Sequence, residues 1–96
     1  MRKSNTQPLG DVIRDYLRAL DIDKKLLEVR LMETWPNVVG IAVAKRTDKL
    51  YIQNKVLFVH LNSSIVRSEL LRIRESLPKA LNERVGAIII NEVVIR

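Results

Sequence analysis

Histidine and serine side chains offer the few groups in this 96-residue chain that suit acid–base or nucleophilic chemistry. His60 is the sole histidine, and it lies in an apolar run that predicts a β-strand, with no second histidine to share a metal ion. Ser63 and Ser64 stand just before a helical pattern, where a serine side chain can cap the first turn. Because neither group has partners at catalytic spacing, we expect no catalytic residue and no enzyme activity.

Cofactor and metal sites lack their usual sequence patterns as well. Gly10, Gly40 and Gly86 are scattered along the chain, whereas a phosphate-binding loop needs its glycines close together. Asp21 and Asp23 lack the remaining ligand positions of a calcium loop and suit a helix cap instead. There is no cysteine to provide a thiolate ligand or a disulfide. The sequence therefore predicts neither a cofactor nor a metal site.

Positive charge is the strongest feature of the composition. The chain has 17 Lys and Arg against 11 Asp and Glu, a net charge of +6, and most of the excess follows Trp35. Such an excess attracts polyanions, although solvated surface is the alternative for each group of cations. We expect the cations around the first strand and on the helix after the hairpin to contact nucleic acid: Lys45, Arg46, Lys49, Lys55, Arg67 and Arg74. Tyr51 shares a strand face with Lys49 and offers a base a stacking surface.

Two helices are expected before the first strand. Residues 9–20 have an amphipathic pattern, and Asp21 or Asp23 is expected to begin a second helix. That helix should end near Trp35, because Pro36 disfavours continuation. Residues 36–44 are small and apolar and suit a short helical turn.

The second of these helices carries two apolar stripes on separate sides. Leu27, Leu31 and Trp35 form the stripe that suits the core. The other stripe is either sandwiched inside the protein or forms a docking face for a protein partner. The candidate partner-binding residues are this second stripe and a leucine between two arginines of the later helix: Leu26, Val29, Met32 and Leu71.

A hairpin and a final strand complete the expected sheet. Residues 49–53 and 56–61 read as two strands around an Asn54-Lys55 turn, since asparagine tolerates the positive φ of tight turns. The helix after Ser63 should kink or divide at Pro78 and end at Gly86. Residues 87–95 read as the last strand, irregular near Asn91. An α+β fold with three strands and its helices on one face follows.

A set of residues spread over the chain has a spacing that is more specific in combination than any one element. They are Trp35, Val38-Val39-Gly40, Ala42, Ala44, Thr47, the run Val59-His60-Leu61-Asn62-Ser63, Glu69-Leu70, Leu81-Asn82 and Val94-Ile95-Arg96. With the helices before Trp35, this pattern resembles the DciA family of bacterial proteins associated with the replicative DNA helicase, and the likeness covers about residues 9–96.

The resemblance implies a single KH-like domain over residues 9–96 after a flexible N-terminus of residues 1–8. It also implies a role in loading or activating the replicative DNA helicase at chromosome replication. The stretch Leu77-Pro78-Lys79-Ala80 stands where true KH modules have a Gly-x-x-Gly loop that clamps nucleic acid. DNA binding is therefore expected to be electrostatic and independent of sequence.

Two other readings remain open: a KH-like module that binds RNA, and a structural protein that associates with itself. The sequence does not fix the oligomeric state. No apolar stretch approaches the roughly 20 residues that span a bilayer. We expect a cytoplasmic, nucleoid-associated protein without a membrane segment.

Overall fold

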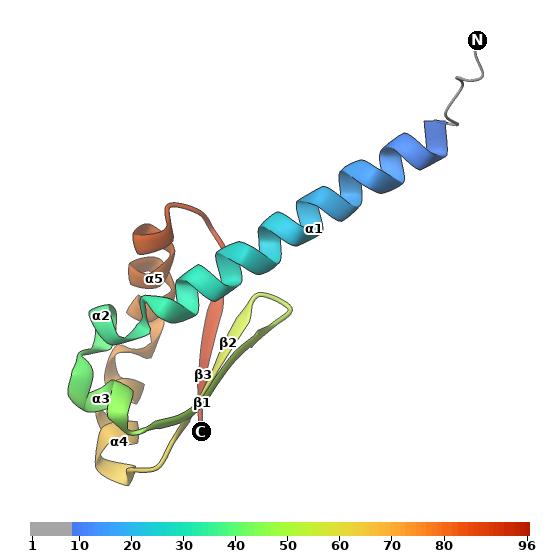
Figure 1. Cartoon of the computed structure of the whole chain (residues 1–96). Coiled ribbons are helices and arrows are strands. Elements are labelled where there is room, and N and C mark those ends of the chain that lie inside the picture. Colours follow the sequence, from blue (N-terminus) through green and yellow to red (C-terminus); the bar gives the residue numbers. More distant parts are fainter. Residues whose placement is uncertain (1–8) are drawn as a thin grey trace.

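A long helix leads into a three-stranded sheet that carries the other helices on one face. The computed structural model describes residues 9–96, and the predicted flexible stretch 1–8 lies outside them. The α+β class and the three-stranded sheet built from a hairpin and a C-terminal strand are confirmed. The elements are α1 (Leu9–Glu33), α2 (Trp35–Val39), α3 (Ile41–Lys45), β1 (Thr47–Gln53), β2 (Val56–Leu61), α4 (Ser64–Ile73), the 3₁₀ turn η1 (Arg74–Ser76), α5 (Leu77–Val85) and β3 (Glu92–Ile95) (Figure 1).

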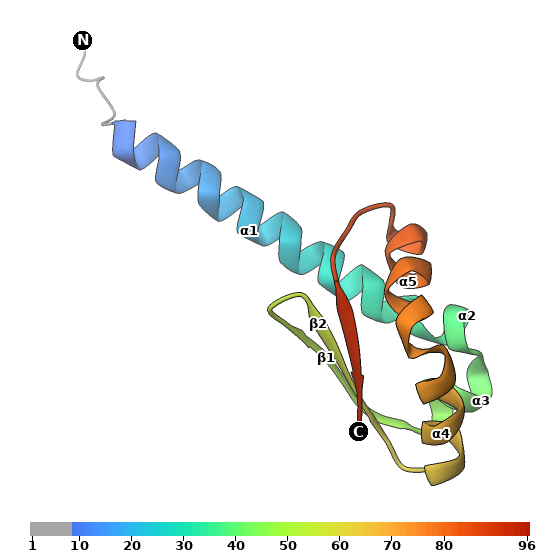
Figure 2. The same ribbon diagram turned by 180° about the vertical axis from the view of Figure 1, so that it is seen from behind.

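The sheet has the strand order β1-β2-β3, with β1 antiparallel to β2 and β2 parallel to β3. Asn54 and Lys55 form the predicted two-residue turn, with φ values of 51° and 63°. Two successive positive φ values match the right-handed twist of the strands, which fixes the hairpin register. The helices α4 and α5 lie on one face of the sheet in both views (Figures 1 and 2).

The prediction of two helices over residues 9–35 is wrong, because α1 continues unbroken to Glu33. No proline or glycine lies between Asp11 and Glu33, and a mid-helix aspartate costs no more than about 0.7 kcal/mol. Asp21 also pairs with Lys25 one turn later, at 3.9 Å. The aspartates that suggested a cap are therefore accommodated on an exposed helix surface.

Most of α1 projects away from the rest of the protein (Figure 1). Leu31 is the only buried residue within Leu9–Glu33, and residues 9–26 make up about 27 Å of helix at about 1.5 Å per residue. The protein measures 66 × 21 × 19 Å, with a radius of gyration of 18.3 Å. A compact domain of this length has about 13 Å, so the projection dominates the shape.

The core lies between the sheet and the helices, and Trp35 is its largest member. Trp35 Nε1 donates a hydrogen bond to Thr47 Oγ1 at 3.0 Å, and Thr47 donates in turn to the Val43 carbonyl. These bonds tie α2 and α3 to the start of β1, and they satisfy the indole in an apolar surrounding. The buried apolar residues are Leu31, Trp35, Leu57, Val59, Leu61, Leu70, Leu77, Leu81, Ile89, Ile90 and Val93.

The C-terminal half follows the predicted boundaries up to Gly86. Ser63 caps α4 by accepting a hydrogen bond from the Val66 amide. The helix divides before Pro78, which sits in the first turn of α5 where a missing N–H does no harm. Gly86 ends α5 with a φ of 84°, a left-handed conformation that glycine adopts without strain.

The last strand is shorter than the predicted 87–95, because β3 begins at Glu92. The side chain of Asn82 holds the preceding segment instead. Its Oδ1 accepts from the amides of Ile89 and Ile90 at 3.0 and 3.2 Å, and its Nδ2 donates to the Ile90 carbonyl at 2.8 Å. One side chain thus replaces the ladder bonds that a longer strand would make.

Candidate functional site

The structure does not gather the predicted nucleic-acid cations into one patch. Lys45 and Arg46 end α3 just before β1, and Lys49 lies within β1. Lys55 is in the hairpin turn, at the opposite end of that strand. Arg74 is in η1, between the two later helices. All five side chains are exposed, but they belong to separate elements and to both ends of β1.

Arg67, the sixth predicted cation, is half-buried and has a structural contact. Its guanidinium donates to the Leu61 carbonyl at 2.9 Å, which links α4 to the end of β2. Arg46 lies close by, because its carbonyl accepts from the Asn62 amide at 2.9 Å. Arg46 and Arg67 therefore mark one end of the sheet, the end away from the hairpin turn.

The sheet face opposite the helices is not covered by any element of residues 9–96. The strand register places Tyr51 opposite Phe58 and Lys49 opposite His60, while the alternate residues of β2 are buried in the core. β3 adds its own alternate residues, because Phe58 lies opposite Val94. The residues of this open face are Lys49, Tyr51, Gln53, Val56, Phe58, His60, Glu92, Val94 and Arg96.

Three rings stand side by side on the open face. The ring centroids of Tyr51 and Phe58 are 5.0 Å apart at an interplanar angle of 14°, and those of Tyr51 and His60 are 5.7 Å apart at 25°. The His60 Nε2 and Tyr51 Oη lie 3.4 Å from each other. Tyr51 of β1 therefore contacts both rings of β2.

Two cations lie against this stack. Lys49 Nζ is 5.9 Å from the Tyr51 ring centroid, and Arg96 Cζ is 5.5 Å from that of Phe58. Of these residues, sequence reasoning identified Lys49 and Tyr51 and missed Phe58, His60 and Arg96. The sequence could have indicated Phe58 and His60, because a two-residue turn at Asn54-Lys55 fixes which residues of the two strands face each other.

The other exposed surface is the apolar stripe of α1. It lies on the same helix face as Leu27 and Leu31, which contact the core, and it extends that face along the projecting segment. The exposed fractions of its side chains run from 47% at Val12 to 74% at Leu9. The stripe consists of Leu9, Val12, Ile13, Tyr16, Leu17 and Leu20.

The predicted partner-binding residues have different surroundings. Leu26 and Val29 are exposed on another side of α1, and Leu71 is exposed on α4. Met32 is half-buried and packs against the core. The α1 stripe itself was missed as a partner surface, because an amphipathic pattern looks the same whether its apolar face meets the core or a partner.

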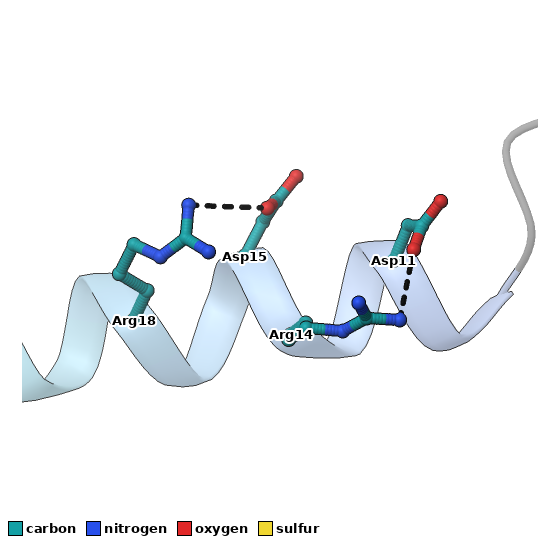
Figure 3. A network of polar contacts seen from close by, with 4 residues as sticks. All are labelled: Asp11, Arg14, Asp15 and Arg18. Carbon is teal, nitrogen blue, oxygen red and sulfur yellow. Dashed lines mark hydrogen bonds and ion pairs between the residues drawn. The ribbon is translucent and has the colours of Figure 1, made fainter.

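Ion pairs occupy the polar side of α1 (Figure 3). Arg14 and Asp11 are 2.9 Å apart, and Arg18 and Asp15 are 4.0 Å apart. Exposed pairs at this spacing stabilise a helix by roughly 0.2–0.5 kcal/mol each. They support the projecting helix and leave its apolar stripe uncovered.

The side chains that could suit acid–base or nucleophilic chemistry have structural contacts in this fold. His60 stacks on Tyr51, and Ser63 caps α4. Among residues 9–96, no cluster of three histidine, cysteine or acidic side chains is suited to hold a metal ion. Over the same residues, no helix has the length and apolar character needed to cross a membrane.

Comparison of the sequence with protein-family models identifies the family of this chain. The family model described as Dna[CI] antecedent, DciA, matches residues 8–95, nearly the whole chain. The chain belongs to the DciA family. This family is associated with loading of the replicative DNA helicase, which places the chain among the proteins of DNA replication. Neither the curated proteins nor the solved structures contain a significant match.

Several residues that carry the DciA resemblance have architectural contacts in the structure. Trp35 and Thr47 are hydrogen-bonded to each other, Ser63 is a helix cap, and Asn82 holds the segment before β3. His60 and Arg96 differ, because both lie on the open face of the sheet. The family pattern therefore describes mainly how the protein is built.

Proposed function

We propose that this chain is a non-enzymatic accessory of the replicative DNA helicase, which it binds through the apolar stripe of α1 while its cations contact DNA without reading its sequence. The observation that carries the proposal is the projecting half of α1, with six large apolar side chains exposed on one face. Membership of the DciA family supports the helicase as the partner.

The energetics of the projecting helix favour a protein partner. Full burial of one large apolar side chain contributes about 1.5–3 kcal/mol, and residues 9–26 draw none of this from the core, since Leu31 is the only buried residue of α1. An amphipathic helix of this kind typically lies in an apolar groove and presents residues at intervals of three and four. The helicase is proposed to supply that groove.

The DNA contact is proposed to be weak and general. The turn between α4 and α5 is formed by Arg74, Glu75 and Ser76, and it has no glycine to let a nucleic-acid backbone approach closely. What remains is the attraction between exposed cations and phosphates, which depends steeply on salt. RNA is the alternative ligand, and a comparison of RNA and DNA oligonucleotides of equal length separates the two.

A pull-down with the purified replicative helicase of the same organism tests the helicase role. Ile13→Glu combined with Leu17→Glu keeps helix propensity and charges the stripe, so recovery of the helicase should fall at least tenfold. Ile65→Glu is the matched control, because Ile65 is 76% exposed on α4, away from the stripe, and its recovery should equal that of the unaltered protein.

Two outcomes contradict the proposal. Equal recovery with the double variant removes the stripe as the helicase-binding surface. A change from dimer to monomer in light scattering, with helicase recovery unchanged, would instead assign the stripe to self-association.

A further inference from the structure

We infer that the open face of the sheet is a stacking site for unpaired bases of single-stranded DNA, centred on Tyr51, Phe58 and His60. The inference rests on the DNA contact in the proposed function and adds a defined surface and a preference for single strands. It does not involve α1 and the helicase.

The stack of rings is the first observation. The rings are 5.0 and 5.7 Å apart and within 25° of parallel, so they stack on one another across β1 and β2, and a base would extend this stack on a ring face turned away from it. All three side chains are half-buried rather than enclosed. Bases stack on exposed aromatic side chains with little dependence on sequence, because every base has a π-face.

The distribution of charge is the second observation. Lys49 and Arg96 lie against the rings, while in the nearby Leu61–Asn62 segment the Arg67 guanidinium donates to the Leu61 carbonyl and the Asp48 carboxylate accepts from the Asn62 side chain. Glu92, the acidic residue of the open face, lies opposite Val56 near the hairpin turn. Lys49 and Arg96 are therefore the two cations that lie beside the phosphates of a DNA strand whose bases contact the rings.

Single strands fit this surface better than a duplex does. Bases in a duplex are already stacked on one another, so a duplex meets the open face through its phosphates and groove edges and not through the faces of its internal bases. Bases of a single strand can leave their neighbours and stack on protein rings, an interaction worth about 1–3 kcal/mol per base. The same surface therefore gives a preference for single strands that cations alone would not.

The rings also stabilise the hairpin, because cross-strand aromatic pairs contribute roughly 0.2–1 kcal/mol. A purely structural role predicts that replacing them changes stability and leaves DNA affinity unaltered. The variants must therefore keep the apolar bulk of the side chains. Leucine does so and removes the π-face.

Fluorescence anisotropy with a labelled oligothymidine and a blunt duplex of equal length tests the inference. Tyr51→Leu combined with Phe58→Leu should weaken oligothymidine binding about tenfold, which corresponds to about 1.4 kcal/mol, and leave duplex binding unchanged. Lys49→Gln combined with Arg96→Gln should weaken both. Lys79→Gln is the matched control, since this exposed lysine lies on α5, and should change neither.

Photocrosslinking gives a measurement that does not depend on variants folding. An oligonucleotide with bromodeoxyuridine in place of thymidine should crosslink to peptides that contain Tyr51, Phe58 or His60 in the unaltered protein. Crosslinks confined to peptides around Arg74, which lies outside the open face, would overturn the inference. Unchanged oligothymidine affinity in the leucine variants would do the same.

Two further controls distinguish the stacking site from the helicase role and from a general attraction of polyanions. The leucine variants should recover the helicase as well as the unaltered protein does, so a failed stacking site leaves the helicase role intact. A polyglutamate peptide should compete poorly with oligothymidine. Equal competition would mean that the face attracts any polyanion and has no base site.

Discussion

The indole Nε1 of Trp35 donates a hydrogen bond to Oγ1 of Thr47 at 3.0 Å, and this bond joins the start of α2 to the start of β1. Trp35 is 2% exposed, so no water can replace Thr47 as the acceptor. The bond links two residues of the family pattern that lie twelve positions apart in the chain.

Thr47→Val tests this bond with little change in shape. Because the buried indole N–H is left without an acceptor, we expect the free energy of unfolding to fall by about 1–3 kcal/mol, measured by urea denaturation. Thr47→Ser keeps the hydroxyl and should lose less. A loss in Thr47→Ser with none in Thr47→Val would show that the methyl group, not the hydrogen bond, matters.

Asn82→Ala should destabilise the protein more than its exposure suggests. The amides of Ile89 and Ile90 lose their acceptor in a segment with both side chains buried, at about 1–3 kcal/mol for each unsatisfied group. The neighbouring Glu83→Ala, on the exposed side of α5, should stay within about 0.5 kcal/mol of the unaltered protein. Similar urea midpoints for the two variants would show that the hydrogen bonds of Asn82 do not stabilise the segment before β3.

Ala19→Pro should break α1 without weakening the core. A proline inside a helix costs about 3 kcal/mol or more locally, but the side chain of Ala19 and its neighbours up to Leu26 are exposed. Far-UV circular dichroism should therefore lose helical signal while the urea midpoint of Trp35 fluorescence stays constant. Leu31→Ala is the contrasting variant, because it removes a buried side chain and should cost about 2–5 kcal/mol. A lower midpoint in Ala19→Pro would mean that the projecting segment packs on the rest of the protein.

Salt titration should count the cations that contact DNA. For a single strand, the slope of log affinity against log salt changes by about 0.7 for each phosphate neutralised. Replacing Lys49 and Arg96 by glutamine should reduce the slope by about 1.4 in total. The leucine variants of Tyr51 and Phe58 should lower the affinity at every salt concentration and keep the slope, since stacking releases no counterions.

The sequence predicted those parts of the fold that local rules determine. The Asn54-Lys55 turn, the Ser63 cap, the division at Pro78 and the end of α5 at Gly86 each depend on the conformation of a few neighbouring residues. Local rules misjudged Asp21 and Asp23, because an aspartate that can cap a helix is also tolerated inside one when its side chain is exposed.

Features that depend on distant contacts were less predictable. The apolar run at residues 87–90 has the composition of a strand, but the amides of Ile89 and Ile90 donate hydrogen bonds to the side chain of Asn82 instead of to a neighbouring strand. The open face needs β3 as well as the hairpin, since Arg96 reaches Phe58 from the far end of the chain. Of the candidate site, the sequence therefore indicated Lys49 and Tyr51 and not the surface around them.

The unbroken course of α1 has a geometric consequence for any partner bound at its outer end. A flexible tether of the same length would set only a maximum distance between that partner and the sheet. A continuous helix sets a nearly constant distance of about 27 Å over residues 9–26 and also fixes the direction. A partner bound to the outer part of α1 would therefore be held in a defined orientation to any ligand on the open face.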